Sequence, residues 1–159
     1  MTEPSSKGAS TRVSRTIKAP RKALYEAFLD RDAVASWLPP ETMTGLVHAL
    51  DPHEGGKFRM SLTYESPEDS QRGKTSEDTD TVQGRFVELV PYEKIAWVVE
   101  FESQDPGFAG EMRVTFTLAD ADGGTDVVVF CEDIPKGVRP EDNELGCRSS
   151  LQKLAALLE

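Results

Sequence analysis

The sequence predicts an α+β domain in which a strongly curved antiparallel sheet of about seven strands surrounds one long C-terminal helix. Three observations lead to this fold class. One strand and two short helices come first, a long region of alternating hydrophobicity with frequent turns follows, and an amphipathic helix ends the chain. Short connections favour antiparallel neighbours, and the apolar face of such a sheet must be covered by the only long helix available.

The first ten residues are mostly Ser, Thr, Pro and Gly without an apolar period, so we expect a disordered tail at 1–10 and a single domain at 11–159. Alternation from Val13 to Ile17 predicts a strand that ends at Ala19–Pro20. Proline suits the first position of a helix because its missing N–H would be unpaired there. The helix that follows has apolar residues at helical spacing: Ala23, Leu24, Ala27 and Phe28.

A second short helix is expected at about Asp32–Leu38, with Asp30 or Asp32 as its N-cap and Pro39–Pro40 as its stop. From Thr42 to Glu132 the pattern is one of strands and turns. It includes a polar, acidic loop at Ser66–Thr79, and the final amphipathic helix begins near Glu141. The clearest strands are expected at Phe58–Tyr64, Val82–Val90, Ile95–Glu102, Met112–Leu118 and Thr125–Glu132.

Composition excludes several partners. The chain has 159 residues with 18 Lys+Arg against 28 Asp+Glu, a net charge of −10, which argues against nucleic acid and anionic membranes. It has no apolar run long enough to span a bilayer and no secretory leader pattern. Two cysteines are too few for a secreted disulfide scaffold, so we expect a cytoplasmic protein.

A series of short segments runs through nearly the whole chain in a fixed order: Ile17–Arg21, Leu24–Phe28, Trp37 before Pro39, Gly55–Phe58, Gly84–Pro91, Ile95 with Trp97, Val114–Leu118, Gly124–Thr125 and Leu151–Leu158. In their order and spacing these segments resemble the helix-grip (Bet v-like) domains of the START-like (SRPBCC) superfamily, especially its heat-shock-protein-90 ATPase activator homologue branch. The resemblance spans about Val13 to Leu158 and implies the helix-grip fold, with a stress-related or chaperone-linked role among many uncharacterised relatives.

Two positions depart from that branch. Gly146–Cys147 stands where the branch usually has a Gly-Trp pair, and Cys131 stands where a His or polar residue often ends the last strand. The mouth of the pocket is therefore expected to differ. The chain is also too short to hold the separate N-terminal domain of the eukaryotic co-chaperones, so direct stimulation of a chaperone ATPase is not expected.

A curved sheet around one helix leaves a gap, and small apolar ligands bind in such gaps. The candidates for the cavity wall are apolar or thiol side chains, and core packing is the alternative for each. Trp37 ends the helix that gates the pocket in the family that the chain resembles, so it is a candidate ligand contact. An equally good interpretation is that Trp37 is an ordinary packing residue between helix and sheet. The full set is Trp37, Phe58, Met60, Leu62, Phe86, Trp97, Val99, Val114, Phe116, Val129, Cys131, Cys147 and Leu151.

Polar candidates for chemistry are few. Alternation places Arg59, Arg85 and Arg113 on the outer face, paired with Glu88, Glu100 and Glu111, unless a bulge turns one arginine inward toward a ligand carboxylate. Cys131 and Cys147 are expected as reduced thiols, with a disulfide, a metal site or a redox pair as alternatives. His48 and His53 are expected in exposed positions. We therefore predict no catalytic residue, no metal and no cofactor.

The leading functional hypothesis is non-catalytic binding of a small hydrophobic or aromatic ligand between the sheet and the C-terminal helix. The alternative is a chaperone-linked or stress-related interaction module, in which the acidic stretches at Glu65–Asp80 and Glu132–Glu144 dock a basic protein partner. A cyclase- or hydrolase-like enzyme is the third hypothesis. The protein is expected to be a monomer or homodimer.

Overall fold

The computed structural model describes residues 9–40, 43–64 and 79–159. The predicted acidic loop at Ser66–Thr79, except for Thr79, and residues 1–8 of the predicted tail lie outside these residues. The elements follow one another as β1 (Ala9–Ile17), α1 (Arg21–Leu29), α2 (Arg31–Trp37), β2 (Met43–Leu50), β3 (Lys57–Tyr64), β4 (Thr79–Val90), β5 (Lys94–Phe101), the 3-10 helix η3 (Pro106–Phe108), β6 (Met112–Ala121), β7 (Gly124–Ile134) and α3 (Pro140–Leu158). None of the helices in these ranges has the length and apolar character that a membrane crossing needs.

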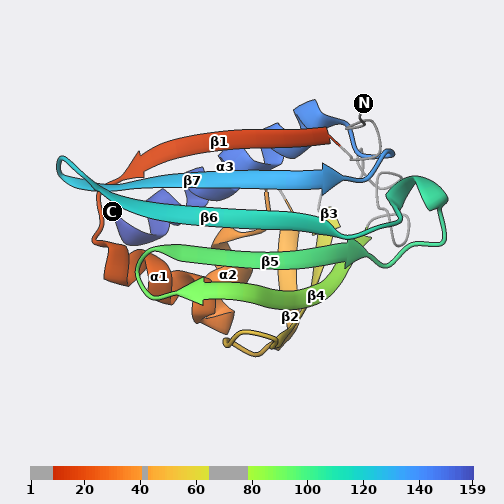
Figure 1. Ribbon diagram of the computed structural model, residues 1–159, viewed down its shortest axis with the longest axis horizontal. Coiled ribbons are helices and arrows are strands. Elements are labelled where there is room, and N and C mark those ends of the chain that lie inside the picture. Colours follow the sequence, from red (N-terminus) through yellow and green to blue (C-terminus); the bar gives the residue numbers. More distant parts are fainter. Residues whose placement is uncertain (1–8, 41–42, 65–78) are drawn as a thin grey trace, which may run out of the picture.

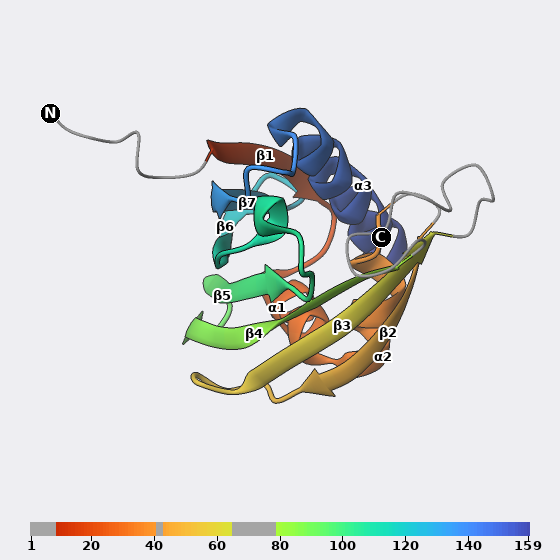
Figure 2. The ribbon, with the colours of Figure 1, turned by 90° about the vertical axis from the view of Figure 1, so that its right-hand side faces the viewer.

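The seven strands form one antiparallel sheet in the order β1-β7-β6-β5-β4-β3-β2. Figure 1 shows α3 running behind β1 and β7, with α1 and α2 near one end of the sheet. Figure 2, turned by 90°, shows the sheet curling from β1 round to β2 with α3 on its concave side. This arrangement confirms the predicted α+β class and the helix-grip architecture.

The ends of the first elements differ slightly from the sequence prediction. Strand β1 begins at Ala9, two residues earlier than expected, because Ala9 pairs with Ile134 at the end of β7. Pro20 is the N-cap of α1 rather than its first residue. Of the two candidate caps for α2, Asp30 has this role, since its side chain accepts a hydrogen bond from the Ala33 N–H over 3.0 Å.

A chain of ring contacts forms the centre of the core. Phe28 of α1 packs edge-to-face on Trp37 of α2 at 4.9 Å between ring centroids, and it packs at a tilt on Phe116 of β6 at 4.7 Å. Phe116 continues to Trp97 at 5.2 Å, and Trp97 to Phe58 at 5.0 Å. Aromatic pairs at these separations each contribute about 1 kcal/mol beyond simple burial. The two short helices are thus fixed to the inner face of the sheet.

Gly84 marks a close approach of two strands. It pairs with Val99 across β4 and β5, and a Cβ atom at this position would overlap the backbone carbonyl of Val98. The register shifts between Phe86 and Glu88 on the same strand, which is the site of a β-bulge. The absence of a side chain at Gly84 therefore allows the sheet to bend tightly here.

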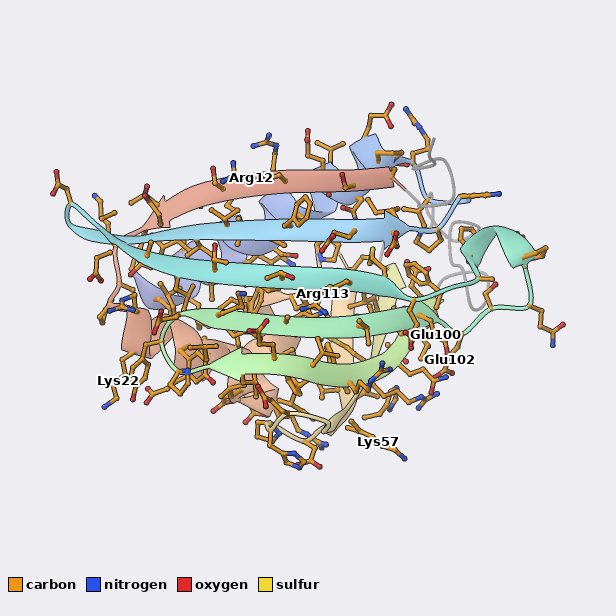
Figure 3. All side chains as sticks on the ribbon, viewed as in Figure 1. Arg12, Lys22, Lys57, Glu100, Glu102 and Arg113 are labelled. Carbon is orange, nitrogen blue, oxygen red and sulfur yellow. The ribbon has the colours of Figure 1, made fainter. Side chains whose placement is uncertain are left out.

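The outer face of the sheet is charged, as alternation predicted. Arg85 pairs with Glu111 at 3.0 Å and Arg113 lies 3.7 Å from Glu88. Arg59 makes two hydrogen bonds, of 2.6 and 2.9 Å, to Glu102 instead of to one of the three predicted glutamates. Figure 3 shows Arg113 on the side of β6 that faces away from α3, and Glu100 and Glu102 at one end of the sheet. None of the three arginines turns into the interior.

Candidate ligand-binding cavity

A cavity of about 670 Å³ lies between the inner face of the sheet and the N-terminal half of α3. Strands β2 to β7 supply its apolar wall, and α3 with the segment before it supplies the opposite side. The apolar and thiol residues of the strands that line it are Met43, Phe58, Met60, Leu62, Val82, Trp97, Val99, Phe101, Met112, Val114, Phe116, Val129 and Cys131.

The inner face carries large side chains because every second residue of each strand points the same way. Phe58 and Met60 alternate with outward Arg59 on β3, and Val114 and Phe116 alternate with outward Arg113 on β6. Phe58, Met60 and Phe116 are at most 3% exposed, so they belong to the core and to the cavity wall at once. Part of the cavity wall is therefore formed by the aromatic core itself.

Ten of the thirteen predicted site residues line the cavity, and Trp37, Phe86 and Leu151 do not. These three are at most 1% exposed and lie within the core. The indole Nε1 of Trp37 donates a hydrogen bond to the Ala27 carbonyl over 3.0 Å, and Phe86 stacks on Phe58 at 6.1 Å. Periodicity identified the inner face, but it did not identify which of the inward side chains are covered by neighbouring side chains of the core.

Some lining residues were missed. Val82, Phe101 and Met112 continue the alternation of residues that were chosen, so the same signal was available for them. Phe108 belongs to η3, a one-turn element that is too short to show an apolar period. The α2–β2 connection, the β7–α3 connection and α3 supply further lining residues: Leu38, Pro40, Gly137, Val138, Arg139, Asp142, Asn143, Leu145, Gly146, Cys147 and Ser150.

Three side-chain hydrogen bonds join α3 to β1 and to the segment after α2. The Ser150 hydroxyl donates to the Leu38 carbonyl over 2.6 Å, and the Lys153 ammonium donates to the Pro39 carbonyl over 2.7 Å. Nearer the helix start, the Thr11 hydroxyl donates to Asn143 Oδ1 over 2.6 Å. The helix is thus tied both to β1 and to the segment after α2, which are distant in sequence.

The polar side chains of the cavity gather at one end. Asn143 and Asp142 lie in the first turns of α3, and Arg139 at its N-cap contacts Asp142 at 3.9 Å while its side chain stays 70% exposed. Asp80 of β4 also lines the cavity. The cavity is therefore apolar over most of its wall, with amide, carboxylate and guanidinium groups near the start of α3.

Cys131 of β7 and Cys147 of α3 meet in the cavity wall, with their Sγ atoms 3.8 Å apart. Both are free thiols. A hydrogen bond from the Cys147 thiol lowers the pKa of Cys131, against the opposing effect of burial. The same contact, burial and the charge of a neighbouring Cys131 thiolate raise the pKa of Cys147. These opposite shifts of the pKa favour a thiolate at Cys131 rather than at Cys147.

Both histidines lie outside the cavity in exposed positions, as predicted. His48 Nε2 contacts Ser61 Oγ at 2.7 Å on the outer face of β2 and β3. His53 is in the turn before β3, where the Glu54 carbonyl and the Asp51 carboxylate raise its pKa. Among residues 9–40, 43–64 and 79–159, no three His, Cys, Asp or Glu side chains gather as a metal ion would require.

The fold and the cavity define a helix-grip protein, a class of ligand-binding or protein-interaction modules. Residues 18–159 match the family described as Activator of Hsp90 ATPase homolog 1-like protein. The chain belongs to this family, as the resemblance of its segments predicted. No curated protein matches the chain.

Solved structures agree with the family. A crystal structure of a protein from Chromobacterium violaceum is 37% identical, covers 94% of this chain and 96% of its own, and superposes with a TM-score of 0.82. The AHSA1 protein from Silicibacter pomeroyi is 20% identical, with 94% and 96% of the two chains covered and a TM-score of 0.75. An AHSA1-like protein from Aeromonas hydrophila is 17% identical, with 93% and 90% covered and a TM-score of 0.68. The last two similarities establish the fold alone.

Proposed function

We propose that the protein binds a small hydrophobic or aromatic molecule in the cavity between the sheet and α3, without catalysing a reaction on it. The observation that supports this is the cavity itself. Its volume of about 670 Å³ lies in the range of small-molecule sites, and its wall is mostly apolar with a few polar groups at one end. The fitting ligand has an apolar body and one polar group that reaches the start of α3.

Burial supplies most of the affinity in this proposal. A ligand that buries about 300 Å² of apolar surface gains about 7.5 kcal/mol before the costs of ordering are subtracted. These costs reduce the net affinity below the value that the gain alone would give. We place this binding in the cytoplasm, where thiols such as Cys131 and Cys147 stay reduced, and in a monomer or homodimer.

Thermal denaturation with a library of apolar and aromatic compounds tests the proposal. Compounds that bind are expected to raise Tm, because they stabilise only the folded chain. The variant Cys147→Trp is designed to place an indole in the cavity, and it is expected to remove the shift. Leu46→Ala is the matched control, since Leu46 is 62% exposed on β2 and does not line the cavity.

Two results would overturn ligand binding. One is a library in which no compound raises Tm, together with no small molecule in mass spectra of extracts from the purified protein. The other is a set of binders whose shifts are the same in Cys147→Trp as in the unaltered chain. The second result would place the binding site elsewhere.

The family match supports a second function, a chaperone-linked or stress-related interaction module. Affinity purification from source cytosol distinguishes the two. A stoichiometric protein partner that is retained by Trp97→Ala, but lost when the acidic charges of residues 65–80 are reversed, supports the interaction module. A partner lost in Trp97→Ala alone contradicts it.

A further inference from the structure

The two cysteines are placed for a chemical step that ligand binding does not use. They come from different elements, β7 and α3, and are 16 residues apart, yet their sulfur atoms are 3.8 Å from each other. A disulfide needs about 2.05 Å between sulfurs. The two Sγ atoms therefore have to approach by less than 2 Å, a distance that side-chain rotation and a small helix shift can supply.

Each thiol has a distinct chemical state. Cys131 is 2% exposed and lines the cavity, so small molecules reach it through the cavity rather than from the outer surface. The Cys147 thiol donates a hydrogen bond to the Cys131 sulfur. Contacts with Thr11 and Asn143 also lower the pKa of Cys131 and so favour its thiolate. Thiolates are the form that attacks peroxides, and a nearby second thiol resolves the product as a disulfide.

We propose that Cys131 and Cys147 form a peroxide-responsive dithiol, in which oxidation joins the two residues by a disulfide and lowers the affinity of the cavity for its ligand. The expected loss of ligand affinity rests on the proposed function. The formation of the disulfide does not rest on it, because it follows from the positions of the two sulfur atoms.

The reaction balances with a hydroperoxide as the oxidant. The Cys131 thiolate attacks one peroxide oxygen, the S–O bond forms, the O–O bond breaks, and hydroxide leaves and takes up a proton. Cys131 is then a sulfenic acid and the peroxide has received two electrons. The sulfur of Cys147 attacks this sulfenic sulfur, the S–S bond forms, the S–O bond breaks, and the hydroxyl leaves as water with the Cys147 proton. With hydrogen peroxide the sum is two thiols and one peroxide giving one disulfide and two waters.

The crosslink changes the cavity because both sulfurs belong to its wall. Drawing Cys147 toward β7 moves the first turns of α3 over the cavity, beside the polar end formed by Asn143 and Asp142. The other half of α3 is held in place by the bonds of Ser150 and Lys153 to the Leu38 and Pro39 carbonyls. The helix therefore pivots instead of sliding, and the space near its start becomes narrower.

The test uses the full chain, hydrogen peroxide as oxidant and 1-anilinonaphthalene-8-sulfonate as an amphipathic probe of the cavity. After denaturation and alkylation with N-ethylmaleimide, the reduced chain is expected to carry two adducts. The peroxide-treated chain is expected to carry none and to have lost two hydrogen atoms, and dithiothreitol is expected to restore both adducts. Titration of the probe is expected to show at least fivefold weaker binding to the oxidised chain, reversed by dithiothreitol.

Cys147→Ser is the matched control, because it keeps Cys131 and removes the resolving thiol at a half-buried position. Under peroxide this variant is expected to form no internal disulfide, so its mass spectrum shows oxygen added at Cys131 and no loss of two hydrogen atoms. Circular dichroism of the reduced variant checks its folding, and Cys147→Ala replaces it if the serine variant fails that check.

Three results overturn the inference: two alkylatable thiols after excess peroxide, a crosslink between chains instead of within one, or an internal disulfide with unchanged probe affinity. A reduced chain that does not bind the probe overturns the proposed function and the affinity part of the inference. In that case the alkylation count still decides whether the disulfide forms, so the two failures are distinguishable.

Discussion

The indole Nε1 of Trp37 donates a hydrogen bond to the carbonyl oxygen of Ala27 over 3.0 Å, and this bond joins α2 to α1 inside the core. The bond pairs the indole N–H, which is the only hydrogen-bond donor of this side chain and is buried away from water. The ring meets Phe28 and Phe116 edge-on, at 4.9 and 6.0 Å, and does not line the cavity. Trp37 therefore supports the aromatic core beneath the cavity without contacting a ligand there.

Trp37→Phe tests this role. We expect a loss of about 2 kcal/mol in the free energy of unfolding, because the Ala27 carbonyl loses a donor and the smaller ring leaves space. Affinity for an apolar probe is expected to stay within about twofold of the unaltered chain. Urea denaturation and probe titration measure the two quantities. A large loss of affinity with unchanged stability would return Trp37 to the role of a ligand contact.

Ser150→Ala tests how α3 is fastened. The hydroxyl of Ser150 is 2.6 Å from the Leu38 carbonyl, and the residue is 8% exposed. Its removal leaves that carbonyl without this donor, which costs about 1 kcal/mol in urea denaturation. Gln152→Ala, at an exposed position of the same helix, serves as the control and is expected to change stability by less than about 0.5 kcal/mol. Equal losses in the two variants would contradict a specific fastening by Ser150.

Gly84 and Gly146 make a second pair of matched variants. Gly84→Ala places a methyl group against the Val98 carbonyl, and we expect a loss of about 3 kcal/mol as β4 and β5 separate. Gly146 lies within α3, and Gly146→Ala adds a methyl group 3.8 Å from Pro40, which is an ordinary contact. We expect the free energy of unfolding to rise by about 0.5 to 1 kcal/mol, because alanine lowers the backbone entropy of the unfolded chain. Thermal unfolding of both variants checks the opposite signs. A tolerated Gly84→Ala would show that the strands do not approach as closely as the structure places them.

The Arg59–Glu102 pair predicts a pH dependence. The guanidinium of Arg59 lowers the pKa of Glu102 below that of the unfolded chain, so the pair stabilises the fold above about pH 4. This contribution disappears as the pH falls through the folded-state pKa. Glu102→Gln is therefore expected to be slightly less stable at neutral pH, since the pair is partly exposed, and equal in stability in strong acid. Urea midpoints of both chains across this range provide the measurement, and a difference that persists in acid would refute it.

Most elements of the fold could be predicted because their patterns are local. Alternation from Phe58 to Leu62 identified the inner face of β3, and the outward arginines followed from the same period. The position of η3 had no such signal, because a single turn formed by Pro106–Phe108 contains too few residues for a period. The strand start at Ala9 also depends on a distant partner, Ile134, which no local pattern indicates.

The site was predicted less completely, for a geometric reason. Phe86 and Phe116 both point inward and are at most 3% exposed, yet only Phe116 lines the cavity. Phe86 packs on Phe58 and Trp97, which belong to other strands, and alternation within one strand does not indicate such contacts. The contact of Cys131 with Cys147 and that of Thr11 with Asn143 likewise join segments that come together only in the fold.

The pairing of β1 with β7 bears on how the protein is made. The first strand is synthesised long before its partner, and Thr125 of β7 donates a hydrogen bond to the Ala19 carbonyl from 106 residues away. Until β7 leaves the ribosome, β1 has no neighbour in the sheet, and the apolar residues of its inner face stay uncovered. Folding that depends on such distant contacts is slow, in the range of about milliseconds to seconds. The cavity is completed only when α3, which follows β7 in the chain, has packed against the sheet.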